Sequence, residues 1–196
     1  MSAEENLQKF LEKNSLELVE KISKGFSSEI FLVIDSKGKN LALKIERDKS
    51  RRLNMALKEA SNLEFANLHG IGPKLFSFDP KLDAILMEFV PGTTFENWLN
   101  KKPAKEKLRK FLDELFVQAK KMDEIGLSHG QLQGRGKNLL VRFPGDTPVI
   151  IDFEKASISR RAKNANQLRA FLFRNKNSDI VKKVNGILGN DVEYFL

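Results

Sequence analysis

Short apolar-rich segments bounded by polar, turn-forming residues dominate the first half of the chain and predict strands. Residues 16–22, 28–34 and 40–46 have this strand-like character, and the turn-rich sequence DSKGKN separates the last two. We expect these three segments to be antiparallel strands. Residues 74–78 and 83–90 have the same character and predict two more strands. The pattern therefore indicates a five-stranded antiparallel sheet.

A helix is predicted before this sheet. Ser2 and Glu5 have the spacing of a capping box, in which each residue's side chain accepts a hydrogen bond from the other's backbone. Leu7, Phe10 and Leu11 then lie on one apolar face of the helix that follows. We expect this short helix to pack on the outside of the sheet.

Two longer helices are predicted by apolar positions that recur every three or four residues. Residues 51–70 have this spacing, and Gly70 ends the pattern. Residues 104–125 give the clearest helical pattern of the chain, with apolar positions at Leu108, Phe111, Leu112, Leu115, Phe116, Ala119 and Met122. This helix leads the backbone to His129.

Shorter elements are predicted on either side of the long helix. Residues 91–102 read as a turn and a helix that Thr93 and Glu96 cap as a box. Residues 138–143 and 148–153 predict two short strands, which the turn FPGDTP separates. We expect them to form a small hairpin.

The order of these elements predicts an α+β fold with two lobes in one domain. The N-terminal helix occupies residues 1–14, and residues 15–90 form the small sheet lobe. Residues 91–196 form a helical lobe, which ends in apolar-periodic sequence from about Asn164 to Leu188. A hinge is expected near residues 88–92.

Composition narrows the class of protein. The 196 residues are 41% hydrophobic, which is enough for a substantial core, and no stretch approaches the roughly 20 apolar residues of a membrane span. We expect a cytoplasmic protein without a membrane partner. The absence of cysteine excludes disulfides, thiolate metal sites and a thiol nucleophile. The net charge of +8 favours a partner that carries phosphate, such as a nucleotide or RNA.

Five short motifs contain the candidate functional residues. Each motif is a weak signal alone, and their order along the chain is the stronger evidence. They are ALKI at residues 42–45, KEASNL at 58–63, MEFVPG at 87–92, HGQLQGRGKN at 129–138 and VIIDFE at 149–154. In this order they resemble the protein-kinase-like fold over residues 22–152. The resemblance is strongest to the small atypical members of that fold, the RIO kinases and the small kinase of the KEOPS complex. It implies a five-stranded N-lobe and, because only 44 residues follow Asp152, a truncated C-lobe.

The resemblance implies a phosphate-binding lysine. Lys44 would hold the α and β phosphates of ATP, and Glu59, fifteen positions on, would fix its ammonium as an ion-pair partner. Glu64 is the alternative partner. The sequence KGFSSE occupies the place of the glycine-rich phosphate loop with a single glycine, and its candidate ligands are Gly25, Ser27 and Ser28.

The resemblance also implies an adenine site at the hinge. Backbone groups of Glu88 and Val90 would bind the edge of the base, and Met87 would stand at the back of the pocket. Four apolar residues are candidate walls for the two faces of adenine, namely Ile22, Ile30, Ala42 and Leu140.

The remaining motifs imply a magnesium site. Asp152 and Asn138 would be the ligands, because Mg²⁺ prefers hard oxygen atoms. Asn138 follows the loop position of Gln131 by seven residues, whereas the family spacing is five. Glu154 replaces the glycine that usually follows Asp-Phe, which favours a fixed rather than a switching segment.

The catalytic loop departs from the family at its base. His129 would hold the loop by hydrogen bonding, and Gln131 stands where kinases carry the aspartate that accepts a proton. An amide has no useful basicity, but it can orient a water molecule, as a glutamine does in GTPases. Arg135 and Lys137 are candidates for contacting the γ phosphate, or they are solvated loop cations.

Three functions remain open at this point. The leading hypothesis is an atypical serine/threonine protein kinase that transfers the γ phosphate of ATP with Mg²⁺, slowly or to itself. The alternatives are a pseudokinase or ATPase subunit of a larger assembly, and a small-molecule phosphotransferase. The basic sequence of residues 154–169, with Arg160, Arg161, Lys163 and Arg169, could face RNA, a ribonucleoprotein or an acidic protein, or simply be a charged surface.

Overall fold

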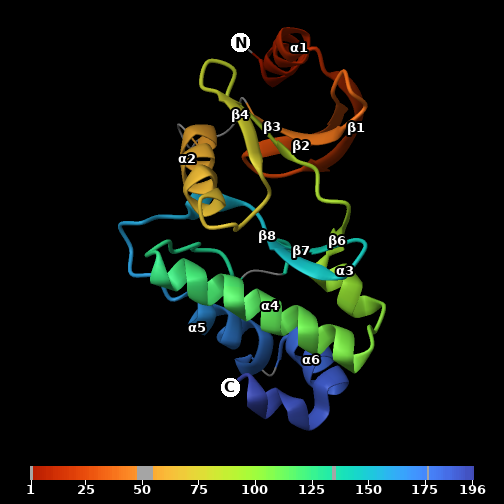
Figure 1. The fold of residues 1–196 in the computed structure, drawn as a ribbon, viewed down its shortest axis with the longest axis vertical. Helices are drawn as coiled ribbons and strands as arrows, with labels where there is room; N and C mark the ends of the chain where they lie inside the picture. The colour runs from red at the N-terminus through yellow and green to blue at the C-terminus, as the bar shows by residue number, and fades with distance from the viewer. Residues whose placement is uncertain (1, 48–54, 134–135, 176) are drawn as a thin grey trace. The chain divides into compact units, whose positions relative to one another are not determined.

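The computed structural model describes residues 2–47, 55–133, 136–175 and 177–196. The chain forms two compact units, Met1–Val90 and Pro91–Leu196. The described residues contain six α-helices and two β-sheets (Figure 1). None of the described helices is long and apolar enough to cross a membrane.

The first unit is built on the predicted five-stranded sheet. Its strands are β1 (Glu17–Lys24), β2 (Ser28–Ile34), β3 (Asn40–Glu46), β4 (Leu75–Asp79) and β5 (Ala84–Glu88). They lie in the order β1-β2-β3-β5-β4, and every neighbouring pair is antiparallel. The predicted sheet is confirmed.

Two helices accompany this sheet. Helix α1 (Ala3–Asn14) begins with both hydrogen bonds of the capping box between Ser2 and Glu5, as predicted. Its apolar face packs with β2, β3 and β5 in a cluster that includes Leu7, Phe10 and Leu11. Helix α2 (Met55–Asn67) contributes Ala56 and Ala60 to a second cluster around Ile85 of β5. The start of the predicted helix, before residue 55, lies outside the described residues.

The second unit is built around the predicted long helix. Helix α4 (Lys105–Glu124) buries all seven of the expected apolar side chains, which confirms the helical spacing. Helices α3 (Phe95–Asn100), α5 (Asn164–Arg169) and α6 (Asp179–Leu188) belong to the same unit. A π-helical turn (Ala170–Arg174) follows α5, and a 3-10 helix (Gly189–Tyr194) follows α6. The predicted C-terminal helical stretch is thus broken after Arg174.

A small sheet in this unit differs from the expected hairpin. Strands β7 (Leu139–Arg142) and β8 (Thr147–Ile150) pair as predicted, but a third strand, β6 (Gly92–Thr94), pairs with β7. The sequence analysis was therefore wrong in reading residues 92–94 as a turn. A side chain at Gly92 would collide with the carbonyl of Val141, so only glycine permits this close pairing.

The helix cap in the same segment also needs correction. The N-cap of α3 is Thr94, whose hydroxyl accepts a hydrogen bond from the Asn97 amide at 3.3 Å. The predicted cap was Thr93, which instead lies in β6 opposite Val141. Two adjacent threonines give the same capping signal, and strand pairing decides which of them ends the extended segment.

Candidate functional site

The first unit holds a buried ion pair between β3 and α2. The Nζ atom of Lys44 lies 2.5 Å from Oε2 of Glu59. Both residues are buried, with 7% of Lys44 and 3% of Glu59 exposed. A buried charge is stable only beside an opposite charge, so the sheet and the helix fix each other's charged side chain. Glu64, the alternative partner in the sequence, is exposed.

The turn between β1 and β2 is held closed by an arginine. The Gly25 amide donates to the Ser28 carbonyl at 2.8 Å, and Nη1 of Arg47 donates to the Gly25 carbonyl at 3.0 Å. Ser27 and Ser28 are both buried. Sequence analysis did not identify Arg47, because a basic residue just after a strand is too common to be a signal.

The predicted hinge follows β5, where the backbone is tied to the start of β4. The Glu88 amide donates to the Lys74 carbonyl at 2.8 Å, and the Lys74 amide donates to Glu88 Oε2 at 3.1 Å. Met87 lies opposite Ala42 of β3, and both are buried. Val90, also buried, is the last residue of this unit. Of the other predicted wall residues, Ile22 lies on β1 and is exposed, and Ile30 lies on β2 and is half-buried.

The loop after α4 is fixed at His129, which is completely buried. Its Nε2 atom lies 3.0 Å from the Ile151 carbonyl, and its ring meets Phe153 edge-on with 5.1 Å between ring centroids. Because a carbonyl only accepts, Nε2 carries the proton in this bond. His129 thus ties the loop to the segment that carries Asp152.

Burial keeps the His129 ring neutral. Loss of hydration lowers the pKa of His129 to about 4, against the opposing effects of the Ile151 carbonyl and the Asp152 carboxylate. The guanidinium of Arg160 lowers the pKa further. A ring that is neutral at pH 7 and hydrogen-bonded to a carbonyl is suited to positioning the backbone.

Asn164 and Asp123 hold the same loop through side-chain hydrogen bonds. Sequence analysis did not identify either of them as a site residue. The His129 amide donates to Oδ1 of Asn164 at 2.9 Å, and Nδ2 of Asn164 donates to the Leu127 carbonyl at 2.8 Å. Oδ1 of Asp123 accepts from both the backbone amide and Nδ2 of Asn164, at 2.6 and 2.8 Å. The only sequence signal was an asparagine at the start of a helical pattern.

Gln131 and Asn138 are brought together although seven positions separate them. Nδ2 of Asn138 donates to the Gln131 carbonyl at 3.3 Å, and the Asn138 carbonyl accepts from the Ile151 amide at 3.0 Å. The Oε1 atom of Gln131 is buried and has no hydrogen-bond partner among the described residues. A buried acceptor without a donor is costly, so this atom is suited to a donor that a ligand or water supplies.

Asp152 follows β8 with an unusual backbone. Its φ and ψ are both 69°, in the left-handed region that few non-glycine residues adopt. It precedes a 3-10 turn (Phe153–Lys155) whose Phe153 is buried. Strained residues of this kind persist where the surroundings hold them, and they are enriched at functional sites.

The second unit therefore gathers His129, Gln131, Asn138 and Asp152 around the end of β8. Leu140 lies on β7 opposite Val149 and is half-buried. Lys137 is exposed, and Arg135 lies outside the described residues. Among the residues that the structure describes, no three His, Cys, Asp or Glu side chains cluster as a metal site. The oxygen donors available here are thus an amide and a carboxylate.

Comparisons with known proteins agree with this fold. The chain is 31% identical over 87 residues to the uncharacterized protein MJ1211 of Methanocaldococcus jannaschii, an alignment that covers 44% of this chain and 72% of that protein. The crystal structure of the Rio2 kinase-ADP/Mg²⁺-phosphoaspartate complex from Chaetomium thermophilum matches 95% of this chain with a TM-score of 0.61 and 19% identity. The chain spans 66% of that kinase chain. No family model matches the sequence. The chain therefore has a RIO-kinase-like fold.

Proposed function

We propose that this chain, which belongs to the family of the uncharacterized protein MJ1211 of Methanocaldococcus jannaschii, binds ATP with Mg²⁺ and transfers its γ phosphate slowly to a protein hydroxyl. The substrate is either a partner protein or the chain itself. The proposal combines the RIO-kinase-like fold with the identity of the buried polar residues.

The observation that carries the proposal is the buried pair of Lys44 and Glu59. Burying a lysine and a glutamate costs free energy that a pair of apolar side chains would avoid, so stability alone does not account for them. A lysine that is held rigidly on a strand is suited to neutralise the phosphates of a nucleotide. We assign Lys44 to the α and β phosphates, and Glu59 to holding its ammonium in place.

Asp152 and Asn138 would hold the metal ion. Both supply oxygen atoms, which Mg²⁺ requires, and Asn138 already uses its Nδ2 on the Gln131 carbonyl, which leaves Oδ1 as the ligand atom. Bound Mg²⁺ would neutralise charge on the phosphate oxygens. The His129 bond to the Ile151 carbonyl holds this segment without help from a ligand.

Gln131 would orient the attacking hydroxyl through Oε1, but it cannot take the proton. In the transfer, the hydroxyl oxygen bonds to the γ phosphorus, and the bond from that phosphorus to the β–γ bridging oxygen breaks to release ADP. The hydroxyl proton passes to solvent or to the transferred phosphate. The transition state is loose, so late proton loss slows the reaction without preventing it.

ATP hydrolysis is a second candidate function, and the buried Oε1 of Gln131 favours it. This acceptor has no partner among the described residues, and a water molecule could donate to it. Water would then take the place of the substrate hydroxyl, as in GTPases that orient water with a glutamine. If neither transfer nor hydrolysis occurs, the protein would be a pseudokinase that only binds ATP.

Incubation with γ-labelled ATP and Mg²⁺ separates these functions. Label on protein supports transfer, released phosphate supports hydrolysis, and a thermal shift with neither product supports a pseudokinase. Lys44→Ala and Asp152→Ala should abolish the signal, whereas Lys37→Ala and Asp179→Ala, at exposed positions of the same units, should not. Unchanged labelling in Lys44→Ala would refute the assignment.

A further inference from the structure

The net positive charge of this protein comes entirely from its second unit. Residues 1–90 contain 14 Lys and Arg against 14 Asp and Glu, whereas residues 91–196 contain 20 against 12. The whole net charge of +8 is therefore carried by the unit that also holds Gln131 and Asp152. A charge that accumulates in one unit attracts a polyanion to that unit.

Within this unit, the segment after the Asp152 turn has cations and no carboxylates. Lys155, Arg160, Arg161 and Lys163, which we call the basic strip, lie within nine residues that contain no Asp or Glu. All four are exposed. In Figure 1 the strip is part of the light-blue coil that leaves β8 and reaches α5.

The basic strip is not neutralised by neighbouring acids. None of its four residues forms an ion pair with another described residue. Other cations of the unit do so, since Lys105 and Arg109 pair with Asp191 and Lys107 pairs with Asp146. Other exposed cations of the unit, such as Lys101 and Lys120, also have no ion pair among the described residues, but the strip brings four within nine residues of sequence.

Arg160 fixes the basic strip against the catalytic loop. Its guanidinium donates to the Lys155 carbonyl, and a β-carbon at Gly130 would lie only 2.7 Å from its Nη2 atom. Gly130 directly precedes Gln131, so a partner on the strip would lie beside the proposed site of transfer. Two features therefore favour glycine at position 130. The Arg160 guanidinium leaves no room for a side chain, and the φ of 80° is one that glycine adopts readily.

We propose that the basic strip binds the phosphate backbone of a nucleic acid. Arginine and lysine side chains can neutralise backbone phosphates whatever the base sequence, and residues 155–163 include no aromatic residue on which a base could stack. The one exposed large apolar residue in this range is Ile158. An acidic protein would need an apolar core of contacts in addition to charge, which this segment does not offer. Recognition is therefore expected to be electrostatic and independent of sequence.

The proposal is tested by binding of labelled RNA and DNA of matched sequence, followed by fluorescence anisotropy over a range of salt concentrations. The wild-type protein should bind, and log K should fall linearly with log salt. Arg161→Gln/Lys163→Gln should weaken binding to every sequence alike and reduce that slope by about 2, one for each lost phosphate contact. Stronger binding of RNA than of DNA would identify contacts to the 2′-hydroxyl, and equal binding would identify phosphate contacts alone.

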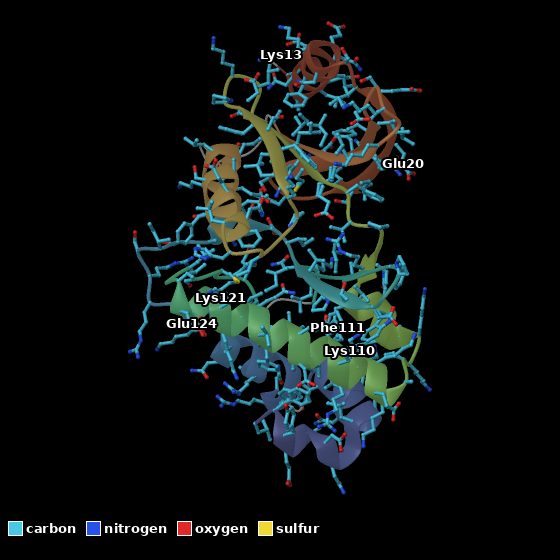
Figure 2. The ribbon with its side chains drawn as sticks, in the orientation of Figure 1. Lys13, Glu20, Lys110, Phe111, Lys121 and Glu124 are labelled. Carbon is cyan, nitrogen blue, oxygen red and sulfur yellow. The ribbon has the colours of Figure 1, made fainter. Side chains whose placement is uncertain are left out.

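A charge-matched control separates the strip from net charge. Lys101→Gln/Lys110→Gln removes two positive charges from exposed positions, one directly after α3 and one on α4, and Figure 2 shows Lys110 far along α4 from Lys121. This variant should bind almost as well as wild type. An equal loss in both variants, absence of binding, or displacement by poly-glutamate at equal charge would overturn the proposal. The assay contains neither ATP nor Mg²⁺, so its failure leaves the proposed phosphoryl transfer untouched.

Discussion

Lys44 of β3 and Glu59 of α2 are joined by a 2.5 Å contact between ammonium and carboxylate, with both side chains less than a tenth exposed. The contact links the central strand of the five-stranded sheet to helix α2. Its energetics differ from those of the surface pairs, because water does not screen it.

Substituting either residue of this pair should destabilise the folded protein. Lys44→Met or Glu59→Gln removes one of the two buried charges that face each other in this contact, and each should lower the free energy of unfolding by about 3–5 kcal/mol. The double variant should lose less than the sum of the two, because both single variants remove the same contact. Urea denaturation of the four proteins measures the coupling.

The pair of Lys13 and Asp79, in which the lysine is exposed, is the control for that cycle. Lys13 is 67% exposed in its side chain, so its removal should change the free energy of unfolding by no more than about 1 kcal/mol. Additive losses at Lys44 and Glu59, of the same small size, would contradict the description of that pair as buried and coupled.

The neutral form of His129 predicts a pH dependence of stability. Its pKa is about 4 in the folded chain and near 6.5 when unfolded, so the unfolded state binds more protons between these values. The stabilisation is therefore full above pH 6.5 and is lost as pH falls toward 4. Between pH 7 and pH 5 the free energy of unfolding should drop by about 2 kcal/mol.

Denaturation of His129→Gln at the two pH values tests this assignment. Glutamine can still donate to the Ile151 carbonyl but does not titrate, so this contribution to the pH dependence should vanish. His69→Gln changes the other, exposed histidine and should retain it. If His69→Gln removed the dependence and His129→Gln did not, the protonation would have been assigned to the wrong residue.

Restoring a carboxylate at the base position should accelerate turnover. Gln131→Asp supplies a proton acceptor where the kinases that the sequence resembles carry an aspartate, and the rate of phosphoryl transfer should rise by about a hundredfold, the low end of general-base effects. Gln133→Asp, two residues on at an exposed position, adds the same charge and should have little effect. Initial rates with labelled ATP compare the two. A rate in Gln131→Asp no higher than wild type would show that the missing base does not limit turnover.

The hydrogen bonds of Asn164 should contribute both to the stability of the protein and to the order of the loop at His129. Asn164→Ala removes the acceptor of the His129 amide and the donor to the Leu127 carbonyl, so we expect a loss of about 3 kcal/mol. Hydrogen exchange at the His129 amide should become faster. Asn166→Ala, at an exposed position of the same helix, should change neither quantity by a measurable amount. Slow exchange at His129 in Asn164→Ala would show that this bond does not hold the loop.

The elements that sequence predicted well are those whose signal is local. The α1 capping box and the seven buried positions of α4 depend on residues a few places apart, so periodicity and cap chemistry suffice to find them. The pairing of Lys44 with Glu59 was also within reach, because a strand motif and a helix motif stood at a familiar separation. Only the structure excludes Glu64 as the partner in this ion pair, because Glu64 is exposed and Glu59 makes the contact.

The elements that sequence missed depend on contacts between distant segments. Strand β6 has three residues without an apolar alternation, and it exists because Gly92 allows a close approach to β7. Asp123 and Asn164 are 41 positions apart, and each alone reads as an ordinary polar residue at a helix end. Arg160 was noted as a surface cation, but its packing on Gly130 could not be inferred from charge.

We propose that Lys44 and Asp152 each contribute to the binding of ATP with Mg²⁺. Isothermal titration calorimetry of ATP in the presence of Mg²⁺ tests it most directly, with wild type, Lys44→Met and Asp152→Asn compared at equal folded fraction. We predict binding by wild type, a loss of at least tenfold in affinity in each variant, and loss of the Mg²⁺ dependence in Asp152→Asn. Unaltered affinity in both variants, or no binding by the wild-type chain, would contradict the account.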